Sequence, residues 1–373
     1  MPFHRKNAIV GSLSQSQAQP IPTEARRNTL PVGIRSSPLD GRSILSTGTA
    51  SLDAVLGGHS GLPLGTCLLL QENGTTDFGG VLLRYFAAEG LVQGHQVHVL
   101  GFGDSWLNEL PGLAIPNKSS RPDPANDRSE MKIAWRYDTL GNHHRREIGP
   151  SGIDPMGMFC HTFDIGKRLK ISDVRGTLLS YPMDTVLGGN CDRITRSHTE
   201  QRPLPRFIRE LADRLDAASS DVVHRVVLPN FLSPTTYDMY GSPAEEVLQF
   251  MHGLRGLLRR YDQQLSVVVH FPTTLYPRTS GMTRWMELFS DGALELTAIA
   301  GGPHGGTSQG VLISHSLPTQ NERGRGSQVV GSHANLSFKL SRSSGLLIEE
   351  LSLPPVLGDD PTSQLPKELT LEF

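Results

Sequence analysis

Cysteine is scarce in this sequence, and long apolar runs and an excess of charge of one sign are missing. The 373 residues include three cysteines, Cys67, Cys160 and Cys191, which lie far apart and form no C-x-x-C pair. This spacing argues against a zinc ribbon and against a disulfide framework. The formal net charge is -2, so overall charge indicates no anionic partner, and any such partner would need a local basic patch.

Segments for secretion or membrane insertion are also missing. The first residues contain no apolar stretch of signal-peptide length. Nowhere do roughly 18 uncharged apolar residues run together, as a membrane-spanning helix would need. We therefore expect a soluble intracellular protein without membrane contact.

Glycine and proline are abundant, with 39 and 26 copies, and they gather in polar stretches without periodicity. Such stretches bury too little apolar area to offset the entropy of ordering. The pattern predicts a disordered N-terminal tail over 1–41 and a folded domain over 42–355. It further predicts insertion loops near 117–130, 188–201 and 318–335, and a flexible C-terminal tail over 356–373.

Between these stretches, strand and helix patterns alternate. An apolar run at 66–70 precedes a helical pattern closed by Gly94, and a second strand pattern follows it, which together indicate a βαβ unit. A helical stripe near 205–218 leads into a strand near 222–230. Strand patterns after 308 look antiparallel. We predict an α/β fold whose central, mostly parallel sheet is flanked by helices and ends in a C-terminal antiparallel β extension.

A further helix is predicted after residue 242. Ser242, Pro243 and Glu245 have the spacing of a capping box with proline at the first helical position. The apolar run at 265–271 that follows this helix is typical of a central parallel strand.

The loop from Gly74 to Gly79 has the place and glycine spacing of a P-loop. In a P-loop, backbone N–H groups wrap the phosphates, a lysine neutralises their charge and a hydroxyl residue ligates magnesium. Here Gly80 and Val81 stand where the lysine and the hydroxyl residue belong, and Asp77 adds negative charge. Gly74, Gly79 and Gly80 thus mark a degenerate P-loop position, and we expect no catalytic residue, cofactor or metal site in this chain.

Two other interpretations of this region stay open. In the first, the loop is a plain strand-to-helix turn, since the glycine spacing alone also fits one. In the second, Glu72, just after the first strand, activates water, although an isolated carboxylate at a strand end is more often a cap or an ion-pair partner. The acidic partner on the metal side is missing as well, because Asn230 ends the strand where such ATPases usually place an acidic residue.

Basic and aromatic residues mix after the strand at 265–271. Arg278 and Arg284 lie near Tyr276 and Trp285, a combination with which RNA-binding surfaces pair phosphates and stack bases. Arg278 and Arg284 are therefore the candidate nucleic-acid contacts. The alternative is a helix cap with Trp285 in the core.

Several ordered segments together resemble the Elongator complex protein 4 family, also called the PAXNEB family. The resemblance spans about two-thirds of the chain, and its most specific segments are STGTASLDAVLGG from Ser46 and MKIAWRYD from Met131. Further segments in family order are GLPLGTCLLLQE, RYFAAEGLVQGHQVHVLG, HTFDIGKRL, RVVLPNFLSP, LQFMHGLRGLLRR, VVVHFPTTLY, LFSDGALEL and FKLSRSSGLLIEELSLPP.

This resemblance implies more than the spacing does. It implies a RecA-like ATPase fold without intact nucleotide motifs, in a hetero-hexameric ring with two related subunits, Elongator proteins 5 and 6. The family's ring binds tRNA and associates with the catalytic Elongator subcomplex, which modifies wobble uridine at position 5, in the cytoplasm and nucleus. The chain would then be a non-catalytic, tRNA-binding ring subunit.

Two alternatives to this function remain. One is an atypical ATPase that binds ATP only at ring interfaces and uses Glu72 with a neighbouring subunit's arginine. The other is a scaffold that organises the complex without touching RNA, since the net charge of -2 requires no anionic partner.

Overall fold

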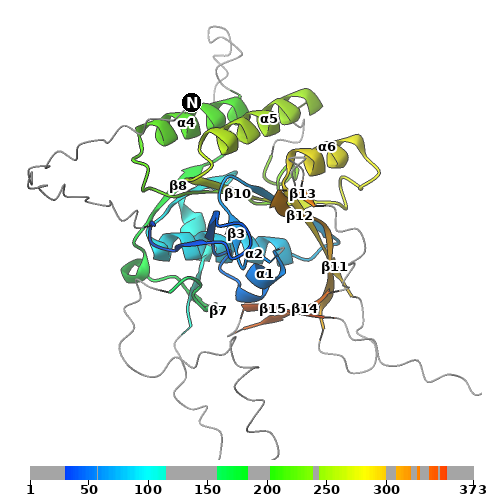
Figure 1. Cartoon of the computed structure of the whole chain (residues 1–373). Helices are drawn as coiled ribbons and strands as arrows, with labels where there is room; N and C mark the ends of the chain where they lie inside the picture. The colour runs from blue at the N-terminus through cyan, green and yellow to red at the C-terminus, as the bar shows by residue number, and fades with distance from the viewer. Residues whose placement is uncertain are drawn as a thin grey trace, which may run out of the picture. The chain divides into compact units, whose positions relative to one another are not determined.

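Short runs of valine and leucine form the central strands, because a parallel sheet is covered on both faces. The computed structural model describes residues 30–56, 58–114, 158–183, 202–237, 243–299, 308–320, 326–327, 336–342 and 345–350. Figure 1 shows the main sheet, whose strand order is β15-β14-β12-β11-β4-β10-β9-β5-β8. In that order the strands are Gly345–Glu350, Leu336–Ser341, Gly310–Gln320, Gly292–Ala298, Cys67–Asn73, Leu265–Pro272, His224–Leu228, Gln96–Leu100 and Thr177–Tyr181.

Strand direction divides this sheet into two parts. The strands from β11 to β8 are parallel, whereas β12, β14 and β15 add antiparallel pairs. The expected mixed sheet with an antiparallel C-terminal extension is confirmed. β4 is separated from β5, the next parallel strand in the chain, by β10 and β9, which come later in sequence. This is the strand order of RecA-like ATPase folds, so the fold class is RecA-like.

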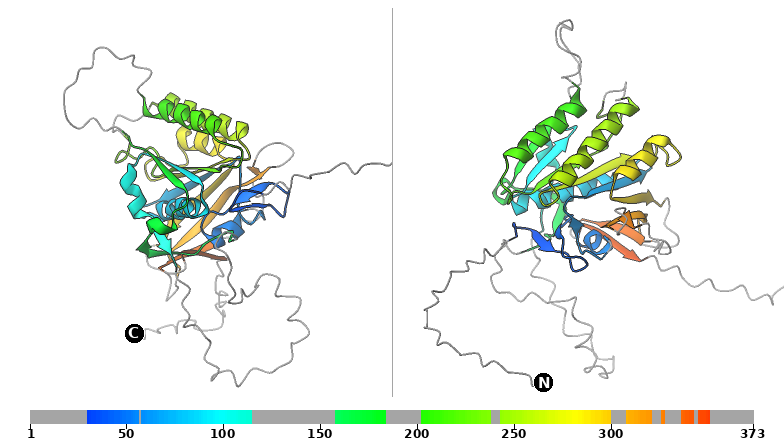
Figure 2. Two further views of the ribbon diagram at one scale, coloured as in Figure 1. Left: turned by 90° about the vertical axis from the view of Figure 1, so that its left-hand side faces the viewer. Right: turned by 45° about the horizontal axis from the view of Figure 1, so that its top comes forward.

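Each face of the sheet carries its own helices and core. Side chains alternate along β4, so Leu68 and Leu70 join one hydrophobic cluster whereas Cys67 and Leu69 join the other. Figures 1 and 2 show α4, α5 and α6 on one face and α2 and α1 on the opposite face. These helices are Pro203–Ala217, Ala244–Arg260, Gly281–Phe289, Phe78–Gln93 and Ala50–Val55.

The predicted helices form, with one correction at a helix start. Phe207, Leu211 and Leu215 of α4 are buried as their spacing indicates, and α2 ends at Gly94 in the left-handed conformation. The correction concerns α5. Its N-cap residue is Pro243 rather than Ser242, so the helix begins one residue later than predicted. Ser242, the serine of the predicted capping box, lies outside the described residues.

Smaller elements lie beside the main sheet and correct two predicted boundaries. β1 (Ile34–Ser36), β2 (Ser43–Leu45) and β3 (Leu62–Pro63) form a three-stranded sheet, so regular structure begins before residue 42. A three-residue strand is too short to show a periodic pattern, and Ile34 is buried because it pairs with Leu45 of β2 and packs into the hydrophobic core. β12 continues to Gln320, and β13 (Gly326–Ser327) pairs with it, so part of 318–335 is strand.

The remaining elements are a short strand pair and two 3-10 helices. β6 (Pro111–Leu113) pairs with β7 (Phe163–Arg168), and two 3-10 helices, η1 (Asp104–Glu109) and η4 (Ile171–Asp173), lie in connections. The predicted loops at 117–130 and 188–201 and the tail at 356–373 fall outside the described residues. Among the helices of the described part, none combines the length and apolarity that crossing a membrane requires.

Gly48 and Gly58 give a matched test of backbone packing. Both have left-handed φ angles, +78° and +83°, so Gly58→Ala should cost about 1–2 kcal/mol from backbone strain alone. A Cβ at Gly48 would in addition overlap the carbonyl oxygen of Tyr85, whereas a Cβ at Gly58 meets no atom of the described chain within 4 Å. We expect Gly48→Ala to be the more destabilising by more than about 1 kcal/mol in urea unfolding. Equal costs would contradict the close approach of Gly48 to α2.

Candidate functional site

The glycine loop lies where a nucleotide-binding loop lies in this fold, at the carboxyl end of β4. α2 begins at Phe78, so the loop proper is Gly74 to Asp77, and Gly74 has a φ of +109°. Gly79, Gly80 and Val81 form the first turn of α2 and are buried. This first turn therefore presents neither an ammonium group nor a hydroxyl group to a phosphate.

The carboxylate of Glu72 fills the space in front of this helix. Its Oε1 accepts hydrogen bonds from the Phe78 N–H at 2.9 Å and the Thr76 hydroxyl at 2.7 Å. Its Oε2 accepts one from the Gly79 N–H at 2.8 Å. The two N–H groups belong to the helix terminus, whose free donors and dipole favour a negative charge. The side chain of Glu72 is only 3% exposed, so it takes the place of water or an external anion there.

His270 of β10 completes the surroundings of Glu72. Its Nε2 lies 2.9 Å from Oε2 of Glu72, but neither ring nitrogen has a partner in hydrogen-bond geometry among the described residues. We therefore treat this contact as an ion pair. A Cβ at position 79 would lie 2.5 Å from the His270 ring, so Gly79 is required here by the imidazole and needs no phosphate to explain it.

The pKa of Glu72 reflects these contacts. Burial alone would raise it, but the close contact and charge of His270, the Thr76 hydroxyl and the Gly79 N–H outweigh burial and hold the pKa below its ordinary value. A general base works best with a pKa near the operating pH. Glu72 is thus a weak base with both oxygens occupied, which speaks against its use to activate water.

No carboxylate follows β9 among the residues described up to Tyr237. β9 ends at Leu228, and Asn230 follows with a positive φ of 46°. The next residue, Phe231, donates its N–H to the His270 carbonyl at 2.8 Å and buries its ring. Within the described ranges, no group of three or more acidic, histidine or cysteine side chains could hold a metal ion, and His143 and His144 lie outside those ranges.

The two candidate RNA-binding arginines differ in their surroundings. Arg278 forms a two-point salt bridge with Glu287, at 2.7 and 3.2 Å, and Glu287 also accepts a hydrogen bond from Gln71 of β4. Arg284 is exposed on α6, and its side chain has no ion pair among the described residues. Trp285 is 49% exposed, so the alternative that buried it in the core is wrong.

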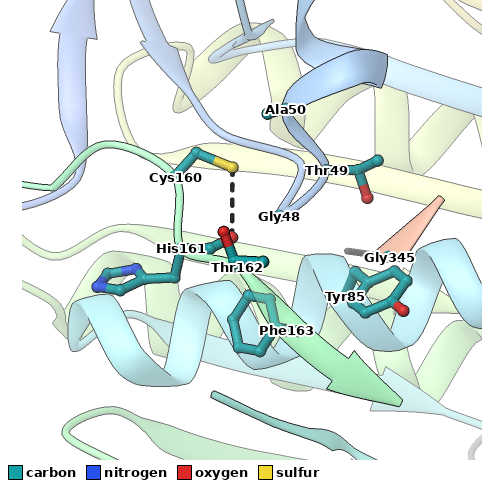
Figure 3. Close-up of a pocket in the computed structure, with 9 residues that line it drawn as sticks. All are labelled: Gly48, Thr49, Ala50, Tyr85, Cys160, His161, Thr162, Phe163 and Gly345. Carbon is teal, nitrogen blue, oxygen red and sulfur yellow. Dashed lines mark hydrogen bonds between the residues drawn. The ribbon is translucent and has the colours of Figure 1, made fainter. Parts of the chain in front are cut away.

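A pocket of about 60 Å³ lies away from the glycine loop, between α2 and the segment before β7. Figure 3 shows Tyr85, Cys160 and Phe163 on its wall, with the Cys160 thiol directed to the His161 carbonyl. The Thr49 and Tyr85 hydroxyls have no hydrogen-bond partner among the described residues. The volume suits a few water molecules and is well below the roughly 300–1,000 Å³ of small-molecule sites. Burial also raises the pKa of Cys160, so its thiol is a poor nucleophile.

β9 carries a buried charge near its start. Arg225 is fully buried and donates to the carbonyls of Ser46 and Phe86 at 2.8 and 3.0 Å and to His95 Nδ1 at 3.0 Å. Burial lowers the pKa of Arg225 to about 10, against the opposing charges of Glu89 and Asp53, so it stays protonated at neutral pH. These contacts tie β9 to α2 and are structural. An arginine inside an apolar strand pattern was the sequence signal for this cluster.

Nearly the whole chain matches one known protein family. The model of the PAXNEB protein family matches residues 26–370. The chain belongs to the PAXNEB family. The sequence prediction of this family is confirmed, and it accounts for the ordered resemblance on both sides of the glycine loop.

Curated relatives of this PAXNEB chain carry one name. Elongator complex protein 4 of Schizosaccharomyces pombe is 31% identical over 281 residues, which cover 72% of each chain. The Xenopus laevis protein of that name is 30% identical over 88% of this chain and 84% of its own. The human protein is 29% identical over 88% of this chain and 80% of its own.

Among solved structures, a KaiC-like protein of Pyrococcus horikoshii matches 82% of this chain and 98% of its own. Its TM-score is 0.42 and its sequence identity 10%. The strand order of the sheet, rather than this likeness, carries the fold assignment.

Proposed function

We propose that this PAXNEB chain is a non-catalytic subunit of an Elongator complex. It forms a hetero-hexameric RecA-like ring with Elongator proteins 5 and 6, and the ring binds tRNA for the catalytic subcomplex. The ring thereby supports 5-carbamoylmethyl and 5-methoxycarbonylmethyl modification of wobble uridine in the cytoplasm and nucleus. Family membership is the observation behind this proposal. The matched relatives are named Elongator complex protein 4, and this chain matches most of their length.

The site geometry supports a non-catalytic role. A degenerate P-loop with Gly80 and Val81 in place of lysine and a hydroxyl residue offers no charge for a triphosphate. Glu72, the base of the alternative ATPase, is buried, fully hydrogen-bonded and has a lowered pKa. We expect the purified chain to hydrolyse no ATP, and any ATP binding to require a ring interface. Turnover by the isolated chain would contradict this part of the proposal.

Arg284 and Trp285 are the proposed contacts with tRNA, with Arg278 in support. Within the described part of the chain the exposed Arg284 guanidinium has no ion-pair partner and is available to a phosphate, and Trp285 presents a half-exposed ring for stacking. Stacking of one base contributes about 1–3 kcal/mol. Arg278 first has to leave Glu287, so its share is smaller.

The test is tRNA affinity of the ring assembled from this chain and its two proposed partners. Arg284→Ala with Trp285→Ala should weaken binding by about tenfold or more and should lower the dependence on salt. Lys167→Ala is the matched control, because Lys167 is an exposed cation on β7 that pairs with Asp164. Unchanged affinity of the assembled variant ring, also after adding Arg278→Ala, would favour the scaffold alternative.

A further inference from the structure

The anion-binding end of α2 is already occupied by a group of this chain. Three hydrogen-bond donors and one imidazole converge on one carboxylate: the N–H groups of Phe78 and Gly79, the Thr76 hydroxyl, and the ring of His270, whose Nε2 lies 2.9 Å away. A phosphate at a helix N-terminus is bound by the same kinds of donor, namely backbone N–H groups, hydroxyls and a cationic side chain. α2 is 16 residues long, so its terminus carries a full dipole effect.

His270 is an independent sign that this place is suited to an anion. Its ring is 2% exposed, and its Nε2 points at the carboxylate from 2.9 Å. Neither of its ring nitrogens has a described hydrogen-bond partner. A buried imidazole without hydrogen bonds is costly unless a nearby negative charge compensates it. An external phosphate would supply that charge if Glu72 were absent.

We propose that Glu72 is a built-in substitute for phosphate, which closes the anion site at the start of α2, and that its removal opens this site to small phosphate anions. A second negative charge cannot approach while the carboxylate is present, because like charges at this distance repel in a buried environment. On this proposal, two features of the chain would oppose nucleotide binding here, the missing lysine and the resident carboxylate. This inference concerns the loop alone and does not depend on the complex in which the chain acts.

The experiment measures binding of inorganic pyrophosphate to the purified full chain by calorimetry and by thermal unfolding. We expect no binding by the unmodified chain. Glu72→Ala should bind pyrophosphate measurably, at least tenfold more tightly than the unmodified chain, and saturating pyrophosphate should raise the unfolding temperature of this variant. In Glu72→Gln the amide NH2 would face the Gly79 N–H, donor against donor, so the side chain should turn away and binding should appear, more weakly than in Glu72→Ala.

Two controls distinguish binding at the anion site at the start of α2 from an effect of the changed net charge. Glu349→Gln removes one exposed negative charge on β15 and should bind no pyrophosphate. Glu72→Ala combined with His270→Asn should lose most of the gained affinity, because the imidazole is gone.

The proposal is overturned if the unmodified chain binds pyrophosphate as tightly as Glu72→Ala, or if the folded Glu72 variants both fail to bind it. Should Glu72→Ala not fold, Glu72→Gln decides, since it keeps the volume of the side chain. Neither outcome bears on tRNA binding, so failure here is distinguishable from failure of the proposed function.

Discussion

Replacing Arg225 by methionine is expected to destabilise the protein by about 3–5 kcal/mol, the usual cost of breaking one side of a buried ionic cluster. The substitution keeps an apolar stem of similar length. It removes the donors that satisfy the Ser46 and Phe86 carbonyls and His95, and it leaves Glu89 buried without the opposing charge. Domains of this kind have total stabilities of about 5–15 kcal/mol, so this single change removes a large share.

Urea unfolding of the full chain measures this effect, with Arg260→Met as the matched control. Arg260 is exposed on α5 and pairs with Asp216, a kind of surface pair that contributes about 0–1 kcal/mol. Arg225→Lys keeps the charge but not the forked donors, and should fall between the two. A cost of Arg225→Met as small as that of Arg260→Met would show that the buried cluster is not needed.

Acidification should destabilise the protein steeply below pH 6.5, because several histidines are buried in the neutral form. Burial, with the charge of Arg214, lowers the pKa of His224 to about 4. Burial and Arg225 lower the pKa of His95 to about 3, and the pKa of His98 is lowered as well. His98 lies between Tyr181 and His224, at 3.1 and 3.0 Å.

The sign follows from proton uptake on unfolding. Unfolded histidines bind protons below pH 6.5, whereas the folded ones do not until their lowered pKa is reached, so stability falls as pH falls through this window. Burial raises the pKa of Asp53 to about 6, and its effect is opposite: between about pH 3.8 and 6, lower pH favours the folded state. His95 and His224 together still outweigh Asp53 by about 1.4 kcal/mol per pH unit near pH 5.

The decisive variant is His224→Gln, which keeps a polar partner for His98 but does not titrate. The difference in unfolding free energy between pH 7 and pH 5 should shrink by about 2 kcal/mol relative to the unmodified chain. His252→Gln, at an exposed position on α5, should leave that difference unchanged. An unaltered pH dependence in His224→Gln would mean that this histidine is not the source of the acid sensitivity.

Local sequence patterns were enough to predict the main elements of the sheet and its helices. The apolar run at 66–70, the helical stripe with Phe207 and Leu211, and the antiparallel strands near the C-terminus formed as expected. β1 was missed, since three residues carry no periodicity and pair only through tertiary contact. The predicted start of α5 was one residue too early, because a fitting spacing does not determine which residue precedes the first helical turn.

The sequence by itself determined the family, the α/β fold class and the absence of a lysine after Gly79, because ordered motifs and residue identities need no coordinates. Only the tertiary structure decided what takes the place of phosphate chemistry at the loop. Glu72 and His270 are almost 200 residues apart, and they meet because β4 and β10 are parallel neighbours whose registers place Glu72 beside Pro272. The burial of Arg225 and the pairing of Arg278 with Glu287 were settled in the same way. Contacts across strands and helices depend on how elements pack, and a linear pattern does not record them.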